Sequence, residues 1–188
     1  PAITDELPLA NVQAFSIDDS HTTEIDDALS LQGLGTGTVT VGIHIAAPGL
    51  AVQPGSPIDQ VGRQRLSTVY MPGYKITMLP DAVVQNYTLS EGQACPAVSL
   101  YVTFNETDLE IQKTETRLER VPIQVNLRHD QLDDRITQVW LEGEDNTDHA
   151  DVPVSRVTLA FFWRLAQTLK ARREVVRGKP ETFNRPDY

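Results

Sequence analysis

Five carboxylates stand within ten residues near the start of the chain, from Asp18 to Asp27. No lysine or arginine occurs among the first sixty residues. Two unit charges 4 Å apart repel by about 1 kcal/mol in water and by about 4 kcal/mol at an effective dielectric constant of about 20. Carboxylates that converge in the fold therefore require a cation, and the simplest candidate is a divalent metal ion with oxygen ligands.

The same acidic run has plainer interpretations. A solvated loop is the commonest fate of such a run, an aspartate or serine in it can cap a helix, and an acidic turn can hold a structural calcium ion. An EF-hand is excluded because the run has no glycine at the sixth loop position and no glutamate at the twelfth. The run by itself leaves the other interpretations open.

Short strands are needed to position these side chains. Residues 12–17 alternate loosely in hydrophobicity and predict a strand that ends at the acidic run, and residues 28–31 predict the returning strand. In an extended segment, Glu24 and Asp26 share one face and Asp27 takes the other. An irregular turn is therefore needed for these carboxylates to meet.

Further motifs follow the acidic run along the chain. The set resembles the catalytic (RNB) domain of the ribonuclease II and ribonuclease R family, whose signature is Ile-Asp, five residues, then Asp-x-Asp-Asp-Ala. This sequence has Ile17-Asp18, five residues, then Glu24-Ile25-Asp26-Asp27-Ala28. The other segments that resemble the family are residues 41–46, 52–59, 69–73, 78–80 and 183–188.

The resemblance implies a processive exonuclease that uses Mg²⁺ or Mn²⁺. It would degrade single-stranded RNA from the 3′ end to nucleoside 5′-monophosphates. Carried over residue by residue, the catalytic and metal-binding carboxylates are Asp18, Glu24, Asp26 and Asp27, and the aromatic residues that clamp the last bases are Tyr70 and Phe183. We expect Asp18 and Asp27 to bind metal directly, Asp26 to contact a second metal or the terminal nucleotide, and Glu24 to act in a supporting or water-mediated role.

The resemblance also implies the fold. We expect an α+β domain with a mixed, mostly antiparallel sheet flanked by helices. Residues 1–188 are expected to form the N-terminal part of a single RNB-like catalytic domain. The remainder of the same polypeptide is expected beyond Tyr188, and it would supply further contacts to the scissile phosphate.

Three residues depart from the family pattern. Glu24 stands where the family has aspartate, so its carboxylate lies on a stem one methylene longer. Ala47 stands where many members have an acid, and Cys95 stands where ribonuclease II has an arginine. These departures keep open the interpretation of an RNA-binding or regulatory protein of the same fold with weak or no catalysis. The acidic run itself keeps open a calcium-stabilised structural module.

Composition limits the remaining possibilities. The single cysteine excludes an internal disulfide and favours the cytoplasm. No apolar run approaches the roughly 20 residues of a membrane helix, so no membrane partner is expected. The net charge of −10 is unusual for a nucleic-acid-binding protein. However, residues 156–185 carry eight basic and two acidic residues. This segment can face a phosphate backbone, form a solvated helix face, or pack on the remainder of the polypeptide.

The rest of the sequence predicts the elements around this site. The expected strands are residues 38–46, 97–104, 110–118 and 121–125, the expected helices are residues 58–69, 130–141 and 153–177, and residues 69–80 are expected to form a loop. His44 lies inside an apolar strand and is expected to be a hydrogen-bonded core residue. Trp140 and Trp163 are expected to be core residues on helix faces.

Overall fold

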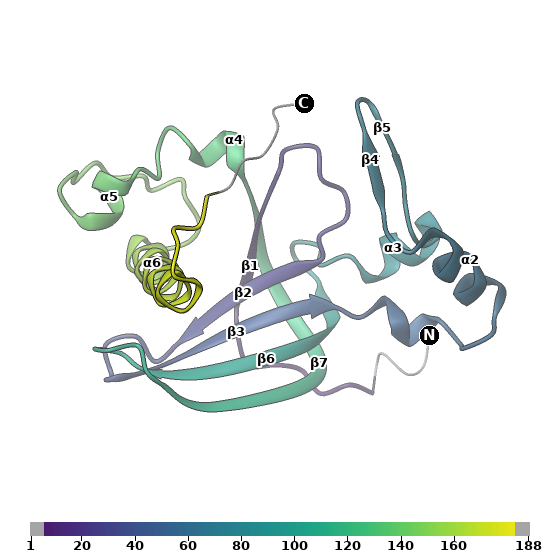
Figure 1. The fold of residues 1–188 in the computed structure, drawn as a ribbon, viewed down its shortest axis with the longest axis horizontal. Helices are drawn as coiled ribbons and strands as arrows, with labels where there is room; N and C mark the ends of the chain where they lie inside the picture. The colour runs from purple at the N-terminus through teal and green to yellow at the C-terminus, as the bar shows by residue number, and fades with distance from the viewer. Residues whose placement is uncertain (1–5, 183–188) are drawn as a thin grey trace.

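A computed structural model describes residues 6–182, and its centre is a closed five-stranded barrel in the order β1-β2-β3-β6-β7 (Figure 1). All neighbouring strands pair antiparallel except β1 and β7, which close the barrel in parallel. The expected mixed, mostly antiparallel sheet flanked by helices is confirmed, and its closure into a barrel is a further finding. The barrel strands are β1 (Ala14–Asp18), β2 (Asp27–Gln32), β3 (Thr38–Ala46), β6 (Ala94–Asn105) and β7 (Ile111–Arg128).

The longest strand, β7, corrects the prediction of two strands at residues 110–118 and 121–125. It runs without interruption for 18 residues and pairs with β6 on one side and β1 on the other. Pro122 did not break it, because this residue lies opposite Ala94, the first residue of β6, where the pairing between β6 and β7 ends. A proline is tolerated in a strand where no ladder hydrogen bond is required from it.

Helices and a small hairpin surround the barrel. The helices are η1 (Pro48–Ala51, a 3-10 helix), α2 (Pro57–Arg65), α3 (Asp81–Tyr87), α4 (His129–Leu132), α5 (Gln138–Glu142) and α6 (Arg156–Arg177). A two-stranded hairpin joins β4 (Val69–Met71) to β5 (Tyr74–Ile76).

Two helix predictions and one loop prediction were therefore wrong in part. The helix expected at residues 58–69 ends at Arg65 because Leu66 takes a positive φ of 64°. The helix expected at residues 130–141 is split, because the side chain of Thr137 accepts a hydrogen bond from Trp140 N and begins a new helix. The loop expected at residues 69–80 contains the β4–β5 hairpin.

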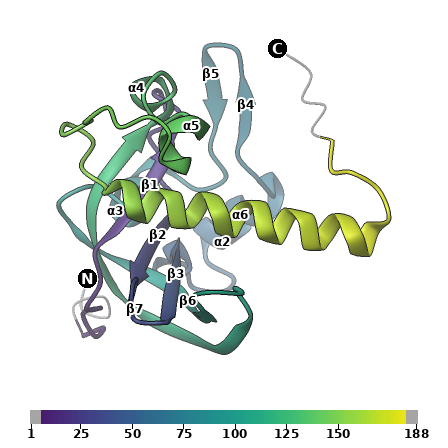
Figure 2. The ribbon, with the colours of Figure 1, turned by 90° about the vertical axis from the view of Figure 1, so that its left-hand side faces the viewer.

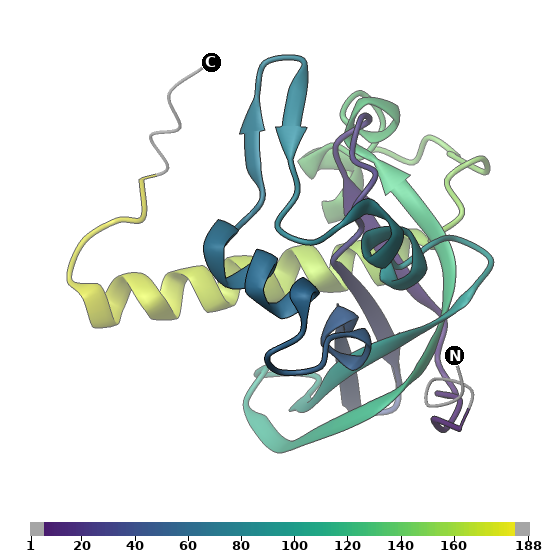
Figure 3. The ribbon, with the colours of Figure 1, turned by 90° about the vertical axis from the view of Figure 1, so that its right-hand side faces the viewer.

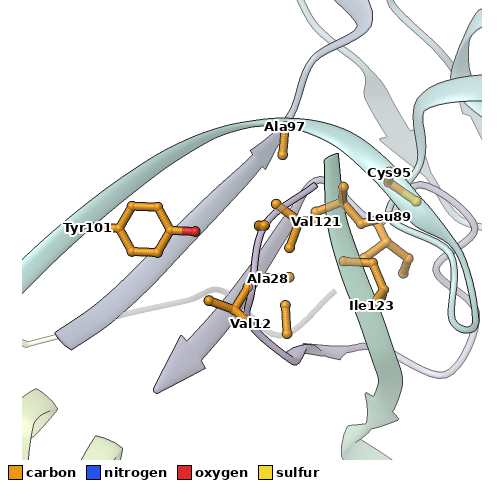
Figure 4. Close-up of a cluster of buried hydrophobic side chains, with 11 residues drawn as sticks. Val12, Ala28, Leu89, Cys95, Ala97, Tyr101, Val121 and Ile123 are labelled. Carbon is orange, nitrogen blue, oxygen red and sulfur yellow. The ribbon is translucent and has the colours of Figure 1, made fainter. Parts of the chain in front are cut away.

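Three clusters of buried apolar side chains hold the elements together. One fills the barrel and includes Ala28, Leu89 and Val121 (Figure 4). A second lies where α6 crosses the barrel, with Phe161 and Leu165 packed among residues of β3 and β6 (Figure 2). The third includes Trp140, which is buried as expected; Trp163 is only partly buried.

The barrel interior also contains a buried imidazole. His44 Nε2 lies 2.8 Å from Ser30 Oγ, and His44 Nδ1 lies 2.7 Å from Ser99 Oγ. The ring is fully buried, and this burial lowers the pKa of His44 to about 4. Gly42 leaves room for the ring, since a Cβ at that position would lie 2.6 Å from His44 Nε2. The prediction of a hydrogen-bonded core histidine is confirmed.

Candidate active site

The acidic segment, which we define as residues 18–27, connects β1 to β2 at one rim of the barrel. Its first half is held against β7, because Arg128 Nη1 donates to the carbonyl oxygens of Asp19 (3.0 Å) and Thr22 (3.1 Å). Ser16 Oγ donates to Asp18 Oδ2 at 2.5 Å and orients that carboxylate. The loop is therefore tied to the barrel by side chains that precede and follow it.

The second half of the acidic segment is held through its backbone. Ile25 N donates to Thr88 Oγ1 at 2.7 Å, and Ile25 O accepts from Leu89 N at 2.9 Å. Asp26 O accepts from Ala46 N at 2.9 Å, and ladder pairing with β3 starts at Asp27. These bonds give the backbone between Glu24 and Asp27 the irregular turn that was expected from the sequence. They also fix the backbone positions from which the carboxylate side chains extend.

Asp26 lies within electrostatic range of the other three predicted carboxylates. Burial raises the pKa of Asp26, and the charges of Glu24, Asp27 and Asp18 raise it further. Burial also raises the pKa of Asp27, with a second contribution from Asp18. Mutual repulsion of this kind is what a bound cation would relieve.

Electrostatic proximity of the carboxylates does not by itself form a metal coordination shell. Across residues 6–182, no three histidine, cysteine, aspartate or glutamate side chains are arranged to hold a metal ion together. The oxygen donors have the chemistry that Mg²⁺ and Mn²⁺ prefer, so the aspartates fit a metal by type but are not gathered around one point in this structure. The roles assigned to them stay predictions.

Glu24 has a partner that the sequence did not reveal. Its Oε2 lies 2.9 Å from Lys75 Nζ, and the same ammonium donates to Thr23 Oγ1 at 2.8 Å. The Glu24 side chain is only 9% exposed, whereas that of Lys75 is 32% exposed. Part of the required positive charge thus comes from β5. Among the four carboxylates in the described part of the chain, Lys75 forms an ion pair with Glu24 alone, although its charge also lowers the pKa of Asp26.

Tyr70, one of the two predicted RNA-binding residues, lies on β4 and is 68% exposed. Burial raises the pKa of Tyr70, the charges of Glu24 and Asp26 raise it further, and Lys75 lowers it. The phenol is therefore close enough to the acidic segment to sense its charge. Phe183, the other predicted aromatic residue, lies outside the described residues.

A small cavity opens beside the acidic segment. Its volume is about 190 Å³, and Glu24 and Asp26 contribute its acidic side chains. Apolar residues, among them Met78, Leu79 and Tyr87, form most of the remaining wall. A cavity lined by both carboxylates and apolar side chains suits a ligand that has both a charged or hydroxylated part and an apolar part.

The other departures from the family pattern lie in packed positions. Ala47 and Cys95 are both buried, and burial raises the pKa of the Cys95 thiol. Cys95 is therefore a packed residue whose thiol is less acidic than a free thiol.

Several arginines of α6 are engaged within the protein. Arg172 donates to the carbonyl oxygens of Asp108 and Leu109, each at 2.9 Å, and Arg173 pairs with Glu181 at 2.8 Å. These side chains are therefore paired within the described part of the chain, which the sequence did not predict, and contact with a phosphate backbone stays a prediction.

The chain belongs to the RNB domain family, which matches residues 7–181. It is 33% identical over 141 residues to "Exoribonuclease 2" of Serratia proteamaculans, an alignment that covers 73% of this chain and 21% of that protein. The fold is similar to that of Mycoplasma genitalium RNase R in complex with ribose-methylated single-stranded RNA, with a TM-score of 0.70, 20% identity, and coverage of 89% of this chain and 26% of that one. It is also similar to yeast Ssd1, a pseudonuclease, with a TM-score of 0.73, 21% identity, and coverage of 98% and 21%.

The chain thus spans about a fifth of the length of the relatives that it matches. Family membership and fold follow from these likenesses. Two of the named proteins, from Serratia proteamaculans and Mycoplasma genitalium, are called ribonucleases, and the third is called a pseudonuclease. Among residues 6–182, none of the helices has both the length and the apolar character needed to cross a membrane.

Proposed function

We propose that this chain provides the acidic part of a metal-dependent 3′-to-5′ exoribonuclease site, which hydrolyses single-stranded RNA to nucleoside 5′-monophosphates. The observation that carries the proposal is the acidic segment itself. In an RNB-family chain, its other three carboxylates are held within electrostatic range of Asp26 at the barrel rim, with an exposed tyrosine beside them. The single cysteine favours the cytoplasm as the location of this activity.

In this proposal, Asp18, Asp26 and Asp27 would hold Mg²⁺ or Mn²⁺. When bound, the metal activates water and stabilises charge on the leaving oxygen. The protein's own contribution is to place these oxygens: Ser16 orients Asp18, and the backbone bonds of Ile25 and Asp26 fix the following residues. Asp26, whose pKa is raised, would also face the terminal nucleotide from the wall of the cavity.

Tyr70 would stack on a base near the 3′ end. Each such stack contributes about 1–3 kcal/mol and tolerates any sequence, as a degradative enzyme requires. Phe183 is proposed as the second stacking residue on the strength of the resemblance alone. The remainder of the same polypeptide would complete the contacts to the scissile phosphate.

A second candidate is an RNA-binding protein of the same fold without catalytic turnover. Two observations favour it: the carboxylate of Glu24 is engaged by Lys75, and no three acidic side chains in the described residues are gathered for a metal. The likeness to a pseudonuclease shows that this fold also occurs in a protein so named.

A single-turnover assay separates the two. The intact protein, in excess over 5′-labelled single-stranded RNA, is mixed with Mn²⁺ or Mg²⁺, and the products are resolved at single-nucleotide resolution. The nuclease proposal expects stepwise shortening from the 3′ end, lost in Asp26→Asn and kept in Asp19→Asn. Unchanged RNA binding without shortening under any metal would establish the second candidate. Binding of calcium in preference to magnesium, with neither RNA binding nor shortening, would indicate a structural module.

A further inference from the structure

The β4–β5 hairpin projects from the body of the molecule on the same side as the acidic segment (Figures 1 and 3). It consists of only three residue pairs, and it forms a separate two-stranded sheet. Its exposed side chains include Tyr70, Met71, Tyr74 and Ile76, so burial contributes little to its stability. An isolated two-stranded hairpin is at best marginally stable in water. Its position must therefore depend on specific contacts.

Those contacts lie at two places. At the base, Arg65 Nη1 donates to Thr77 O at 2.7 Å, and Met78 N donates to Thr68 Oγ1 at 3.1 Å. Nearer the tip, the contact is Lys75, which donates to Glu24 Oε2 and Thr23 Oγ1. Among residues 6–182, Lys75 is the side chain that ties the hairpin strands to the acidic segment through an ion pair.

The strand register connects this ion pair to the exposed tyrosine. Lys75 lies directly opposite Tyr70 in the β4–β5 pairing, and directly opposed residues project from the same face of a sheet. Holding the ammonium group of Lys75 at Glu24 therefore turns the face that carries Tyr70 toward the acidic segment. The influence of Glu24 and Asp26 on the pKa of Tyr70 agrees with this placement.

Glu24 is more deeply buried than Lys75, so the two partners of the ion pair differ in exposure to water. The Glu24 carboxylate is almost fully covered and lies near Asp26, so removing the lysine leaves a buried negative charge with a like charge beside it. Breaking such a pair from one side is strongly destabilising. The hairpin is the part that can move away and let water reach Glu24.

We infer that Lys75 is a positioning residue: by pairing with Glu24 it docks the β4–β5 hairpin and holds Tyr70 beside the acidic segment. In this chain Glu24 is the docking point for the hairpin and not a direct metal ligand. The docking stands on the structure alone, and its consequence for RNA rests on the proposed function.

Hydrogen–deuterium exchange of the intact protein tests the docking without RNA or metal. Amides of residues 69–76 should exchange roughly tenfold faster in Lys75→Met and in Glu24→Gln, with the barrel strands unchanged. The double variant should exchange no faster than either single variant, because both remove the same contact. Lys75→Arg should retain most of the protection. Lys113→Met, which removes another lysine paired with a glutamate, should leave the hairpin unchanged.

A variant that carries aspartate at position 24, as in the family pattern, gives a further test of the docking. Glu24→Asp keeps the charge but shortens the side chain by one methylene, so its carboxylate should no longer reach Lys75. The hairpin should therefore loosen in Glu24→Asp as it does in Glu24→Gln. Unchanged hairpin exchange in Lys75→Met, or additive effects in the double variant, would overturn the inference.

The consequence for RNA is measured with single-stranded RNA carrying 2-aminopurine at its 3′ end. Stacking on Tyr70 should quench the fluorescence, and the quenching should fall in parallel in Tyr70→Ala and Lys75→Met. If Tyr70→Ala abolishes quenching while Lys75→Met leaves it intact, Lys75 does not position Tyr70 and the inference fails. If the unaltered protein shows no quenching but the exchange results hold, the docking is supported and the stacking role within the proposed function is refuted.

Discussion

Protonation of His44 should weaken the barrel as the pH falls from 6.5 toward 4. The imidazole is wholly buried between Ser30 and Ser99, and burial lowers its pKa from 6.5 to about 4, although the negative charge of Glu119 opposes the change. The folded-state pKa lies below that of the unfolded chain, so the unfolded chain binds the proton more tightly. The stability contributed by His44 is therefore fully present above pH 6.5 and is lost as the pH falls through the folded-state pKa. At about 1.4 kcal/mol for each unit between the two values, the full loss is about 3.4 kcal/mol, and about 3 kcal/mol of it has occurred by pH 4.

Urea unfolding of the wild type and of His44→Gln at pH 7, 6, 5 and 4 measures this effect. Other groups titrate in the same range, but they do so in both proteins, so the difference in unfolding free energy isolates His44. That difference should favour the wild type most at pH 7 and should change by about 3 kcal/mol by pH 4.

Val39→Ala is the matched control, because Val39 is also fully buried on β3 and does not titrate. It should destabilise the barrel by an amount that does not depend on pH. A constant difference for His44→Gln, or an imidazole that titrates near 6.5 by NMR in the folded protein, would refute the reasoning.

Three further predictions concern the site. Asp18→Asn and Asp27→Asn should weaken Mn²⁺ binding by calorimetry relative to Asp19→Asn; equal affinities in all three would remove the proposed metal site. Asp26→Asn should abolish hydrolysis in the complete protein while RNA affinity, measured by fluorescence anisotropy, changes little; cleavage at the native rate would contradict the role given to Asp26. Tyr70→Ala should weaken RNA binding by about 1–3 kcal/mol with little dependence on sequence, and an unchanged dissociation constant would exclude stacking at this residue.

Local patterns were enough to predict the strands beside the acidic segment. β3 was predicted at its observed bounds, because residues 38–46 are β-rich and follow a segment with three glycines. In the structure these glycines have positive φ, and Val39 and Val41 are buried. The burial and hydrogen bonding of His44 also followed from its place in that strand. Signals of this kind lie within a few residues and need no knowledge of the fold.

Closure of the barrel could not be predicted in the same way. It depends on parallel pairing between β1 and β7, which are separated by more than ninety residues, and nothing in either segment marks the other as its partner. The continuity of β7 through Pro122 likewise depends on where β6 ends. Both features are set by tertiary pairing, which overrides local propensity.

The contact between Lys75 and Glu24 could not be predicted from the sequence for a similar reason. In sequence, Lys75 lies in a segment punctuated by proline and glycine, and it is 51 residues from Glu24. The absence of basic residues from the first sixty positions correctly indicated that a positive charge must come from elsewhere. The sequence did not indicate that a lysine would supply part of it.

Lys75 changes what can be expected of a metal at this site. The positive charge of Lys75 offsets the negative charge of Glu24. The Glu24 carboxylate is also nearly buried, so it is poorly placed to bind a metal ion as well. Asp18, Asp26 and Asp27 form no salt bridge among the described residues, and the pKa values of Asp26 and Asp27 are raised in part by neighbouring carboxylates. A divalent ion would therefore gain most from these three aspartates. The longer side chain at position 24 then has a physical explanation: it lets the carboxylate reach the hairpin, while the aspartates keep the shorter stems that hold their oxygens close to the barrel rim.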